Sequence, residues 1–130
     1  MMQKAILCVD DEEIILESLR EQLEKSFGSS YIYETAENAE EGIEIVDELS
    51  NDGISVLIIV SDWLMPGIKG DEFLIKVHQK YPDIVTVMLT GQADERSIEK
   101  AKTYANLYAV VHKPWAEEEL VEIIRSGLER

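Results

Sequence analysis

The feature that most constrains the fold is an uninterrupted apolar run, residues 56–60, that leads to a carboxylate and then to a Pro-Gly turn. The run reads V-L-I-I-V, the carboxylate is Asp62, and the turn is Pro66-Gly67. A run this rich in Val and Ile predicts a strand covered on both faces, which is typical of a central parallel strand. Open α/β sheets place their chemistry at the carboxyl ends of such strands. Asp62 is therefore the residue around which other polar groups are expected to gather.

Four other strand-like segments alternate with helical patterns along the chain. Strands are expected at residues 4–9, 31–35, 56–60, 84–89 and 107–111. Helical spacing of apolar residues follows each of them, and strands joined by helical crossovers must be parallel. The second segment is short and only partly alternating, which suits an edge strand. The sequence predicts an α/β fold: a doubly wound five-stranded parallel sheet of order 2-1-3-4-5, the flavodoxin-like (βα)5 arrangement, as one domain over residues 1–130.

Two of the expected helices carry specific local signals. Asn38, with Glu41 three residues later, is a plausible capping pair for the second helix. The fourth helix, about residues 94–106, has a thin inward stripe of Ile98, Ala101 and Ala105. Because so little apolar area can be buried there, we expect this helix to be among the less firmly docked elements.

Charge and composition exclude several classes of function. The formal net charge is −15, from 27 acidic and 12 basic residues, so the surface repels phosphate backbones and direct nucleic-acid binding is not expected. No apolar stretch is long enough to span a bilayer, and residues 1–4 lack a signal-peptide layout. Cys8 is the one cysteine, so no intramolecular disulfide can form, and a small buried strand residue is its simplest interpretation. A cytoplasmic location without membrane attachment is expected.

Polar side chains follow four of the five expected strands. They are Asp10 and Asp11, Asp62, Thr90 and Lys113. The carboxyl ends of the strands share one edge of such a sheet, and three close carboxylates need a cation to remain ionised. Hard oxygen ligands beside solvent suit Mg²⁺. A Thr hydroxyl and a Lys ammonium next to that ion would cradle a phosphoryl group.

Taken singly, these residues have plainer interpretations. Asp10 and Asp11 alone would be a helix N-terminus, Thr90 a turn hydroxyl and Lys113 a surface lysine, because short motifs often occur by chance. Their joint placement at the strand ends favours a functional site.

Four ordered motifs carry a resemblance to a known family. They are V-D-D-E at 9–12, S-D-W-L-M-P-G-I-K-G at 61–70, L-T-G at 89–91 and H-K-P-W at 112–115. Together they resemble the receiver domain of two-component response regulators, similar to chemotaxis receivers, and the resemblance covers essentially the whole chain. The resemblance implies that Asp62 is the phosphoacceptor, which takes a phosphoryl group from a sensor histidine kinase or a phosphotransfer protein.

The same resemblance implies roles for the surrounding residues. Asp10, Asp11 and Asp62, with the main-chain carbonyl of Leu64, match the ligands of Mg²⁺. Thr90 matches the switch hydroxyl and Lys113 the lysine that pairs with the acyl phosphate. The Lys113-Pro114 bond is cis in this family, a geometry that proline permits.

The family also implies partners. The face of the fourth helix, fifth strand and fifth helix would contact a downstream protein or a fused output domain, and the resemblance allows a dimer that forms on phosphorylation. Such a domain is not an enzyme with an outside substrate, since it catalyses only its own phosphorylation and loss of phosphate.

The chain departs from the family pattern at one position in particular. The aromatic residue often found three residues before the lysine is here Val110, and Tyr108 would share its strand face if strand pairing were regular. Leu64 and Gln92 occupy variable positions that the family uses to tune phosphoryl lifetime. We expect the bulky, apolar Leu64 to impede the attacking water.

Other polar and aromatic residues receive simpler interpretations. Trp63 and Trp115 are expected to pack, His78 to lie at the surface of a helix, and His112 to end a strand.

Two alternatives to a receiver stay open. One is a pseudo-receiver, a protein interaction module that is never phosphorylated. The other is a haloacid-dehalogenase-type phosphatase, which is a poor match because Leu64 stands where that family places a second Asp.

Overall fold

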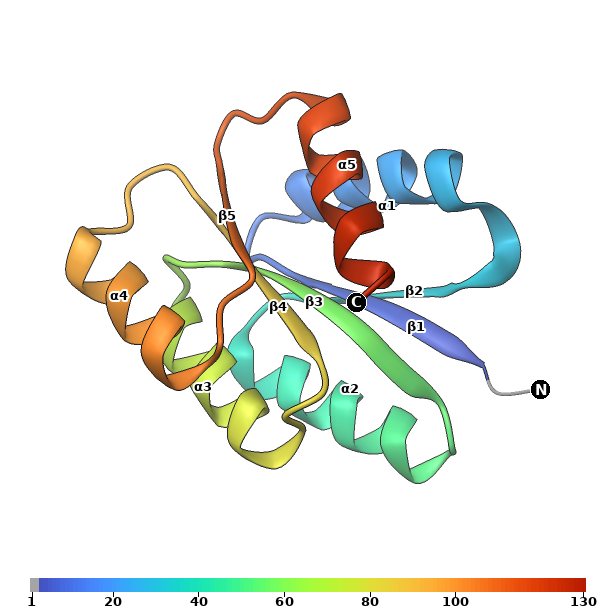
Figure 1. Ribbon diagram of the computed structural model, residues 1–130, viewed down its shortest axis with the longest axis horizontal. Helices are drawn as coiled ribbons and strands as arrows, with labels where there is room; N and C mark the ends of the chain where they lie inside the picture. Colours follow the sequence, from blue (N-terminus) through green and yellow to red (C-terminus); the bar gives the residue numbers. More distant parts are fainter. Residues whose placement is uncertain (1–2) are drawn as a thin grey trace.

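All the strands of residues 3–130, the part of the chain that the computed structural model describes, run parallel in one sheet of order β2-β1-β3-β4-β5 (Figure 1). Residues 1 and 2, the start of the segment inspected for a signal peptide, lie outside this range. The five strands are β1 (Lys4–Val9), β2 (Ile32–Ala36), β3 (Ser55–Asp62), β4 (Val85–Thr90) and β5 (Ala109–His112). The predicted strand order and the edge position of β2 are confirmed.

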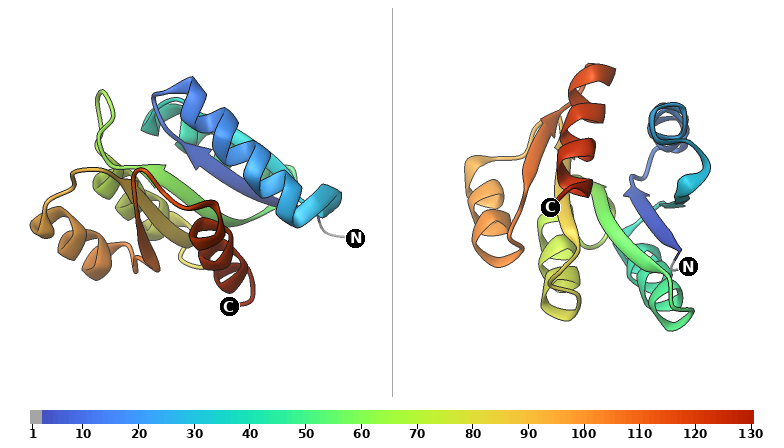
Figure 2. Two further views of the ribbon diagram at one scale, coloured as in Figure 1. Left: turned by 90° about the horizontal axis from the view of Figure 1, so that it is seen from above. Right: turned by 45° about the vertical axis from the view of Figure 1, so that its right-hand side comes forward.

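Helices cover both faces of the sheet. They are α1 (Glu13–Phe27), α2 (Ala39–Asn51), α3 (Gly70–Lys80), α4 (Glu95–Tyr104) and α5 (Glu117–Leu128), and a short 3-10 turn, η1 (Gly28–Ser30), follows α1. Helices α1 and α5 lie on one face, and α2, α3 and α4 on the other (Figures 1 and 2). This is the predicted doubly wound arrangement. Among residues 3–130, no helix combines the length and apolarity needed to cross a membrane.

The burial of β3 on both faces explains its continuous apolar sequence. Ile58 and Val60 pack into the layer of α1 and α5, whereas Ile59 packs into the layer of α2, α3 and α4. All three side chains are completely buried. Burying an Ile or Val side chain stabilises the fold by about 1.5–3 kcal/mol relative to leaving it exposed. The strand that carries Asp62 is therefore held from both sides.

The local signals of the second and fourth helices have the expected effects. The side chain of Asn38 accepts a hydrogen bond from the backbone N–H of Glu41 at 2.8 Å, as the predicted N-cap requires. Within α4, Ala101 is the one fully buried residue, and Ala105 is buried just beyond its end. The small apolar area predicted for this helix is therefore present.

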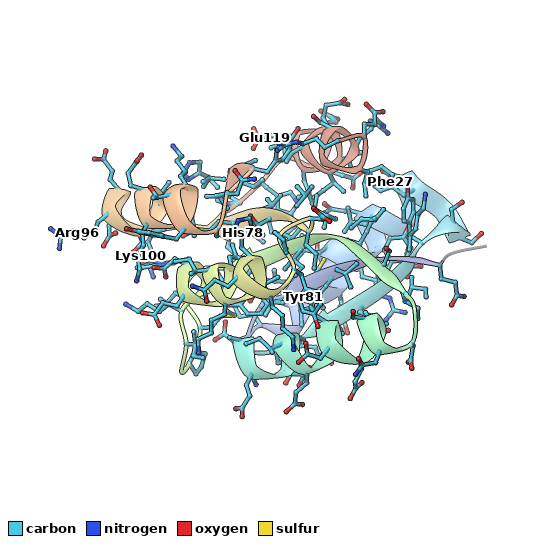
Figure 3. The ribbon with its side chains drawn as sticks, turned by 60° about the horizontal axis from the view of Figure 1, so that its bottom comes forward. Phe27, His78, Tyr81, Arg96, Lys100 and Glu119 are labelled. Carbon is cyan, nitrogen blue, oxygen red and sulfur yellow. The ribbon has the colours of Figure 1, made fainter. Side chains whose placement is uncertain are left out.

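His78 differs from its predicted surface position. It is half-buried on α3, and its Nδ1 atom is enclosed without a hydrogen-bond partner within the described part of the chain (Figure 3). The reason is its spacing: His78 follows the fully buried Leu74 by four residues, so the two side chains share one face of the helix.

Parallel pairing in register brings the strand ends to one edge of the sheet. Val9 pairs with Ser61, Asp62 with Leu89, and Thr90 with His112. The residues that end β1, β3, β4 and β5 are therefore neighbours, although they are up to about one hundred positions apart in the chain.

Helix α3 begins in close contact with the end of β3. The N–H of Gly70 donates to the carbonyl oxygen of Trp63 at 2.8 Å. A Cβ atom at Gly70 would lie 2.1 Å from the carbonyl oxygen of Asp62 and 2.8 Å from the Cα of Trp63. Both atoms belong to the backbone, which cannot yield as a flexible side chain can. Glycine at this position is therefore required by packing.

We predict that Gly70→Ala lowers the free energy of unfolding by about 1–3 kcal/mol, the usual cost of overpacking. Alanine is ordinarily the better residue in a helix, so the clash with the Asp62 carbonyl reverses the usual sign. Urea denaturation measures the effect. Gly91→Ala is the matched control, because a Cβ there would lie an ordinary 3.8 Å from the Cβ of Lys113. Equal effects of the two substitutions would contradict the packing argument.

Candidate functional site

Three carboxylates meet at the carboxyl edge of the sheet. Asp10 and Asp11 directly follow β1, and Asp62 is the last residue of β3. One oxygen atom from each lies within 4.8 Å of the others. Asp10 and Asp62 are buried, whereas Asp11 is exposed. The site is thus built on rigid strand ends but has one side open to solvent.

Lys113 provides the positive charge of this cluster. Its Nζ atom lies 2.8 Å from Oδ2 of Asp10 and 3.2 Å from Oδ1 of Asp62. Burial alone lowers the pKa of Lys113, but the hydrogen bonds and charges of Asp10 and Asp62 outweigh that effect and raise the pKa above its ordinary value. Lys113 therefore stays protonated, and it joins the end of β5 to the ends of β1 and β3.

The negative charge of the cluster is only partly compensated. Burial raises the pKa of Asp62 to about 6, and the charge of Asp10 adds to the rise, while Lys113 lowers it only in part. One ammonium faces three carboxyl groups, so an ionised cluster carries excess negative charge. Carboxylate oxygens beside solvent fit a hard divalent cation, and Mg²⁺ binds in proteins through one or two carboxylates and several waters.

Thr90 ends β4 beside the carboxylates. Its Oγ1 atom accepts hydrogen bonds from the backbone N–H groups of Gln92 at 3.0 Å and Ala93 at 2.8 Å. The hydroxyl therefore orders the turn that leads into α4. The backbone N–H of Lys113 donates to the carbonyl oxygen of Thr90 at 2.9 Å, which ties this turn to the end of β5.

The predicted residues other than Asp10, which is fully buried behind them, line one open pocket of roughly 530 Å³. Its lining residues are Asp11, Glu12, Asp62, Leu64, Met65, Pro66, Thr90, Gly91, Gln92 and Lys113. The side chain of Leu64 is 46% exposed at this pocket. The structure thus brings the predicted strand-end residues together, and their individual roles stay predictions. The Lys113-Pro114 peptide bond is cis, as the resemblance implies.

Tyr108 does not lie on the same face of the sheet as Val110, which regular strand pairing would require. It packs in the layer of α1 and α5, where its hydroxyl contacts the hydroxyl of Ser126, whereas Val110 packs in the layer of α2, α3 and α4. The two residues do not share a face because strand β5 begins only at Ala109, so the alternation of a regular strand does not include Tyr108. Tyr108 therefore cannot replace the missing aromatic side chain at Val110.

Sequence reasoning missed a buried polar contact next to Asp62. The indole Nε1–H of Trp63 donates to Oδ1 of Asp71 at 3.1 Å, and both residues are buried. Asp71 reads in the sequence as an ordinary first-turn acid of a helix. The available signal was Trp63 itself, because a buried indole N–H requires an acceptor.

Comparison with known proteins identifies the family. The response regulator receiver domain family matches residues 6–125. The chain therefore belongs to this family of two-component signalling domains. Among curated relatives, the hydrogenase transcriptional regulatory protein HoxA of Cupriavidus necator is 32% identical over 127 residues, which is 98% of this chain and 24% of that protein. The phosphate regulon transcriptional regulatory protein PhoB of Pseudomonas aeruginosa is 31% identical, over 100% of this chain and 54% of that protein. The chain thus spans about a quarter to a half of these relatives.

Solved structures agree with this assignment. The signal receiver domain of an HD domain-containing protein from Pseudomonas fluorescens Pf-5 has a TM-score of 0.86 and 29% identity, covering 98% of this chain and 95% of that chain. A CheY-like response regulator receiver domain from Methanospirillum hungatei JF-1 has a TM-score of 0.84 and 29% identity, covering 98% and 94%.

The raised pKa of Asp62 predicts a pH-dependent stability. The folded protein binds the Asp62 proton more tightly than the unfolded chain, so stability is lost as the pH rises from the ordinary value of 3.8 to about 6. Asp62→Asn should therefore raise the free energy of unfolding at about pH 7.5, and the gain should shrink toward about pH 4.5. Urea denaturation at both pH values measures this. Asp83→Asn, at an exposed turn, controls for the loss of one negative charge. If Asp62→Asn raised the free energy of unfolding equally at both pH values, the raised pKa of Asp62 would be contradicted.

Proposed function

We propose that this chain is a phosphorylation-controlled receiver in which Asp62 accepts a phosphoryl group from a histidine kinase or a phosphotransfer protein. The observation that carries the proposal is the Lys113 ammonium, which lies within 3.2 Å of both Asp62 and Asp10 in an open, solvent-accessible pocket. A buried nucleophile with a fixed positive charge and room for a donor group is what phosphoryl transfer to a carboxylate requires.

The proposed phosphoryl transfer needs little acid–base catalysis. A carboxylate oxygen of Asp62 bonds to phosphorus while the phosphorus–nitrogen bond of the phosphohistidine breaks, and the electron pair of that bond stays on the imidazole. With a pKa of about 6, Asp62 is largely ionised at neutral pH and needs no general base. Lys113 offsets charge on the transferred group, and the backbone of β3 holds the nucleophile in place.

A divalent cation completes the proposed site. Asp10, Asp11 and Asp62, together with the main-chain carbonyl of Leu64, would hold Mg²⁺. When bound, the ion neutralises negative charge on the carboxylates and on the phosphoryl oxygens. The excess negative charge of the cluster supports this part of the proposal.

Thr90 connects the proposed reaction to a conformational change. Its hydroxyl would turn toward a phosphoryl group on Asp62 and give up the hydrogen bonds from Gln92 and Ala93. The turn before α4 would then rearrange, and α4 buries little apolar area to resist this. The face of α4, β5 and α5 would transmit the change to a downstream protein, a fused output domain or a second copy of the chain. The proposed domain works in the cytoplasm and turns over no outside substrate.

Direct phosphorylation tests this function. With Mg²⁺ and acetyl phosphate, we expect intact mass to rise by one phosphoryl group on the parent protein and not on Asp62→Asn. Beryllofluoride with Mg²⁺ should change the fluorescence of Trp63, the neighbour of Asp62, in the parent only. Asp83→Asn is the matched control for loss of a carboxylate outside the pocket. No mass change in the parent, or equal labelling of Asp62→Asn, would overturn the phosphoacceptor and favour a module that is never phosphorylated.

Leu64 sets the expected lifetime of the aspartyl phosphate. Its apolar side chain lines the pocket that contains Asp62 and offers no hydrogen bond to an attacking water. We predict severalfold faster loss of phosphate from Leu64→Asn, measured by intact mass after removal of acetyl phosphate. Leu64→Ala separates the causes, because steric exclusion predicts faster loss in both variants and water positioning predicts it for Asn alone. Unchanged rates in both variants would refute a role for Leu64.

A further inference from the structure

A chain of contacts that starts at two buried residues and ends at an exposed lysine joins the residue after Asp62 to helix α4. It has three members, Trp63, Asp71 and Lys100, and we refer to them as the α4 latch. The indole N–H of Trp63 donates to Oδ1 of Asp71 at 3.1 Å. The other carboxylate oxygen, Oδ2, lies 4.0 Å from Nζ of Lys100. The latch therefore spans the end of β3, the first turn of α3 and the middle of α4.

The Trp63 end of the latch is firmly held. Trp63 is buried, and the ammonium of Lys69 lies 5.0 Å from the centre of its ring, within range of a cation–π interaction. The N–H of Gly70 holds the carbonyl oxygen of Trp63, and Gly70 packs directly on the Asp62 backbone. These contacts leave little room for Asp62 to move unless Trp63 and the start of α3 move with it.

The Asp71 carboxylate is placed where its charge matters. Its side chain is only 7% exposed, and within residues 3–130 it has one cation within ion-pair distance, Lys100 of α4. The neighbouring acid, Glu72, lies 3.9 Å from the same ammonium but is 54% exposed. A buried carboxylate is screened less by solvent than an exposed one, so Asp71 is the stronger partner of Lys100 even at a similar distance.

The position of Lys100 makes this contact relevant to α4. Lys100 extends from α4 on the side that faces α3 (Figure 3). Helix α4 buries little apolar surface, with Ala101 as its one fully buried residue and Ile98 partly buried against the same layer, so ion pairs from Lys100 to α3 contribute to holding it. The family's aromatic relay is also lacking here, because Val110 occupies that position and Tyr108 faces α5.

We propose that the α4 latch holds α4 in its unphosphorylated position and couples this helix to the state of Asp62. The inference rests on the proposed function, since it assigns the route by which phosphorylation is reported. In the unphosphorylated protein Thr90 orders the turn before α4 and Asp71 attracts Lys100, so the helix is restrained at its start and near its middle. Phosphorylation releases the Thr90 turn, and α4 then moves against the attraction of Asp71.

Removing the charge of the latch should favour the phosphorylated arrangement. Asp71→Asn keeps an oxygen that accepts the Trp63 hydrogen bond but loses the attraction for Lys100, and Lys100→Met loses the same attraction from the other side. Because coupling between two sites is reciprocal, a weaker latch means tighter binding of a phosphoryl mimic. We expect beryllofluoride, with saturating Mg²⁺, to bind each variant about two- to fivefold more tightly, the range that one partly exposed ion pair supports.

Two measurements on the full chain test this. Titration of beryllofluoride gives its affinity for each protein. Before beryllofluoride is added, the peptide that covers α4 should exchange its amide hydrogens faster in Asp71→Asn and Lys100→Met than in the parent. The double variant should resemble Lys100→Met, because that substitution already removes the contact of Lys100 with Asp71 as well as the contact with Glu72. Glu72→Gln is the matched control, since it removes an exposed charge next to Asp71, and Lys102→Gln removes a charge of α4 that pairs only with Glu99 of the same helix, among the described residues.

The outcomes separate the latch from the proposed function. Affinity and α4 exchange that change in Asp71→Asn and Lys100→Met, but not in the two controls, support the latch. The latch is overturned if Lys100→Met has the same beryllofluoride affinity and the same α4 exchange as the parent. The Lys100 side chain is 45% exposed, so this substitution leaves the core intact. If the parent takes up phosphate from acetyl phosphate on Asp62 in that case, the proposed function stands without the latch. If the parent takes up none, both proposals fail.

Discussion

The ammonium of Lys113, held between Asp10 and Asp62, is the interaction on which the arrangement of this protein depends. Two carboxylates could not be buried side by side at the end of a sheet without a positive charge between them. The lysine comes from the last strand and the acids from the first and third, so the pair forms only when β5 has completed its side of the sheet. The site formed by Asp10, Asp62 and Lys113 is therefore complete only when the sheet is complete.

The fold supplies rigidity and mobility at different places for different reasons. Strand β3 is buried on both faces, and the close contact of Gly70 prevents its end from shifting relative to α3. Helix α4, in contrast, is held by a small apolar stripe of Ile98, Ala101 and Ala105, a capped first turn and polar contacts. Polar contacts can be exchanged at small cost, whereas packed apolar surface cannot, so α4 can change position more readily than the body of β3 can.

Most of the fold and of the candidate site could be read from the sequence, and the exceptions have physical causes. Strand ends were predictable because each apolar run stops at a polar residue, which places Asp62, Thr90 and Lys113. The burial of Asp71 was not predictable, because acids in a first helical turn normally face solvent. Only the packing of α3 against Trp63 encloses this carboxylate. The direction of Tyr108 depended on where the β5 ladder begins, which the alternation pattern does not specify.

The two apolar layers have a consequence for how the molecule can change shape. The layer with α1 and α5 shares no helix with the layer that contains α4, and the sheet separates them. Rearranging α4 therefore disturbs neither the packing beneath α1 nor that beneath α5. In the proposed phosphorylation, the layer of α1 and α5 can stay fixed and keep the reacting atoms aligned while α4 changes position. Under that proposal, a partner bound to α1 could stay attached throughout, whereas a partner bound to α4 would be released or recruited each time Asp62 gains or loses a phosphoryl group.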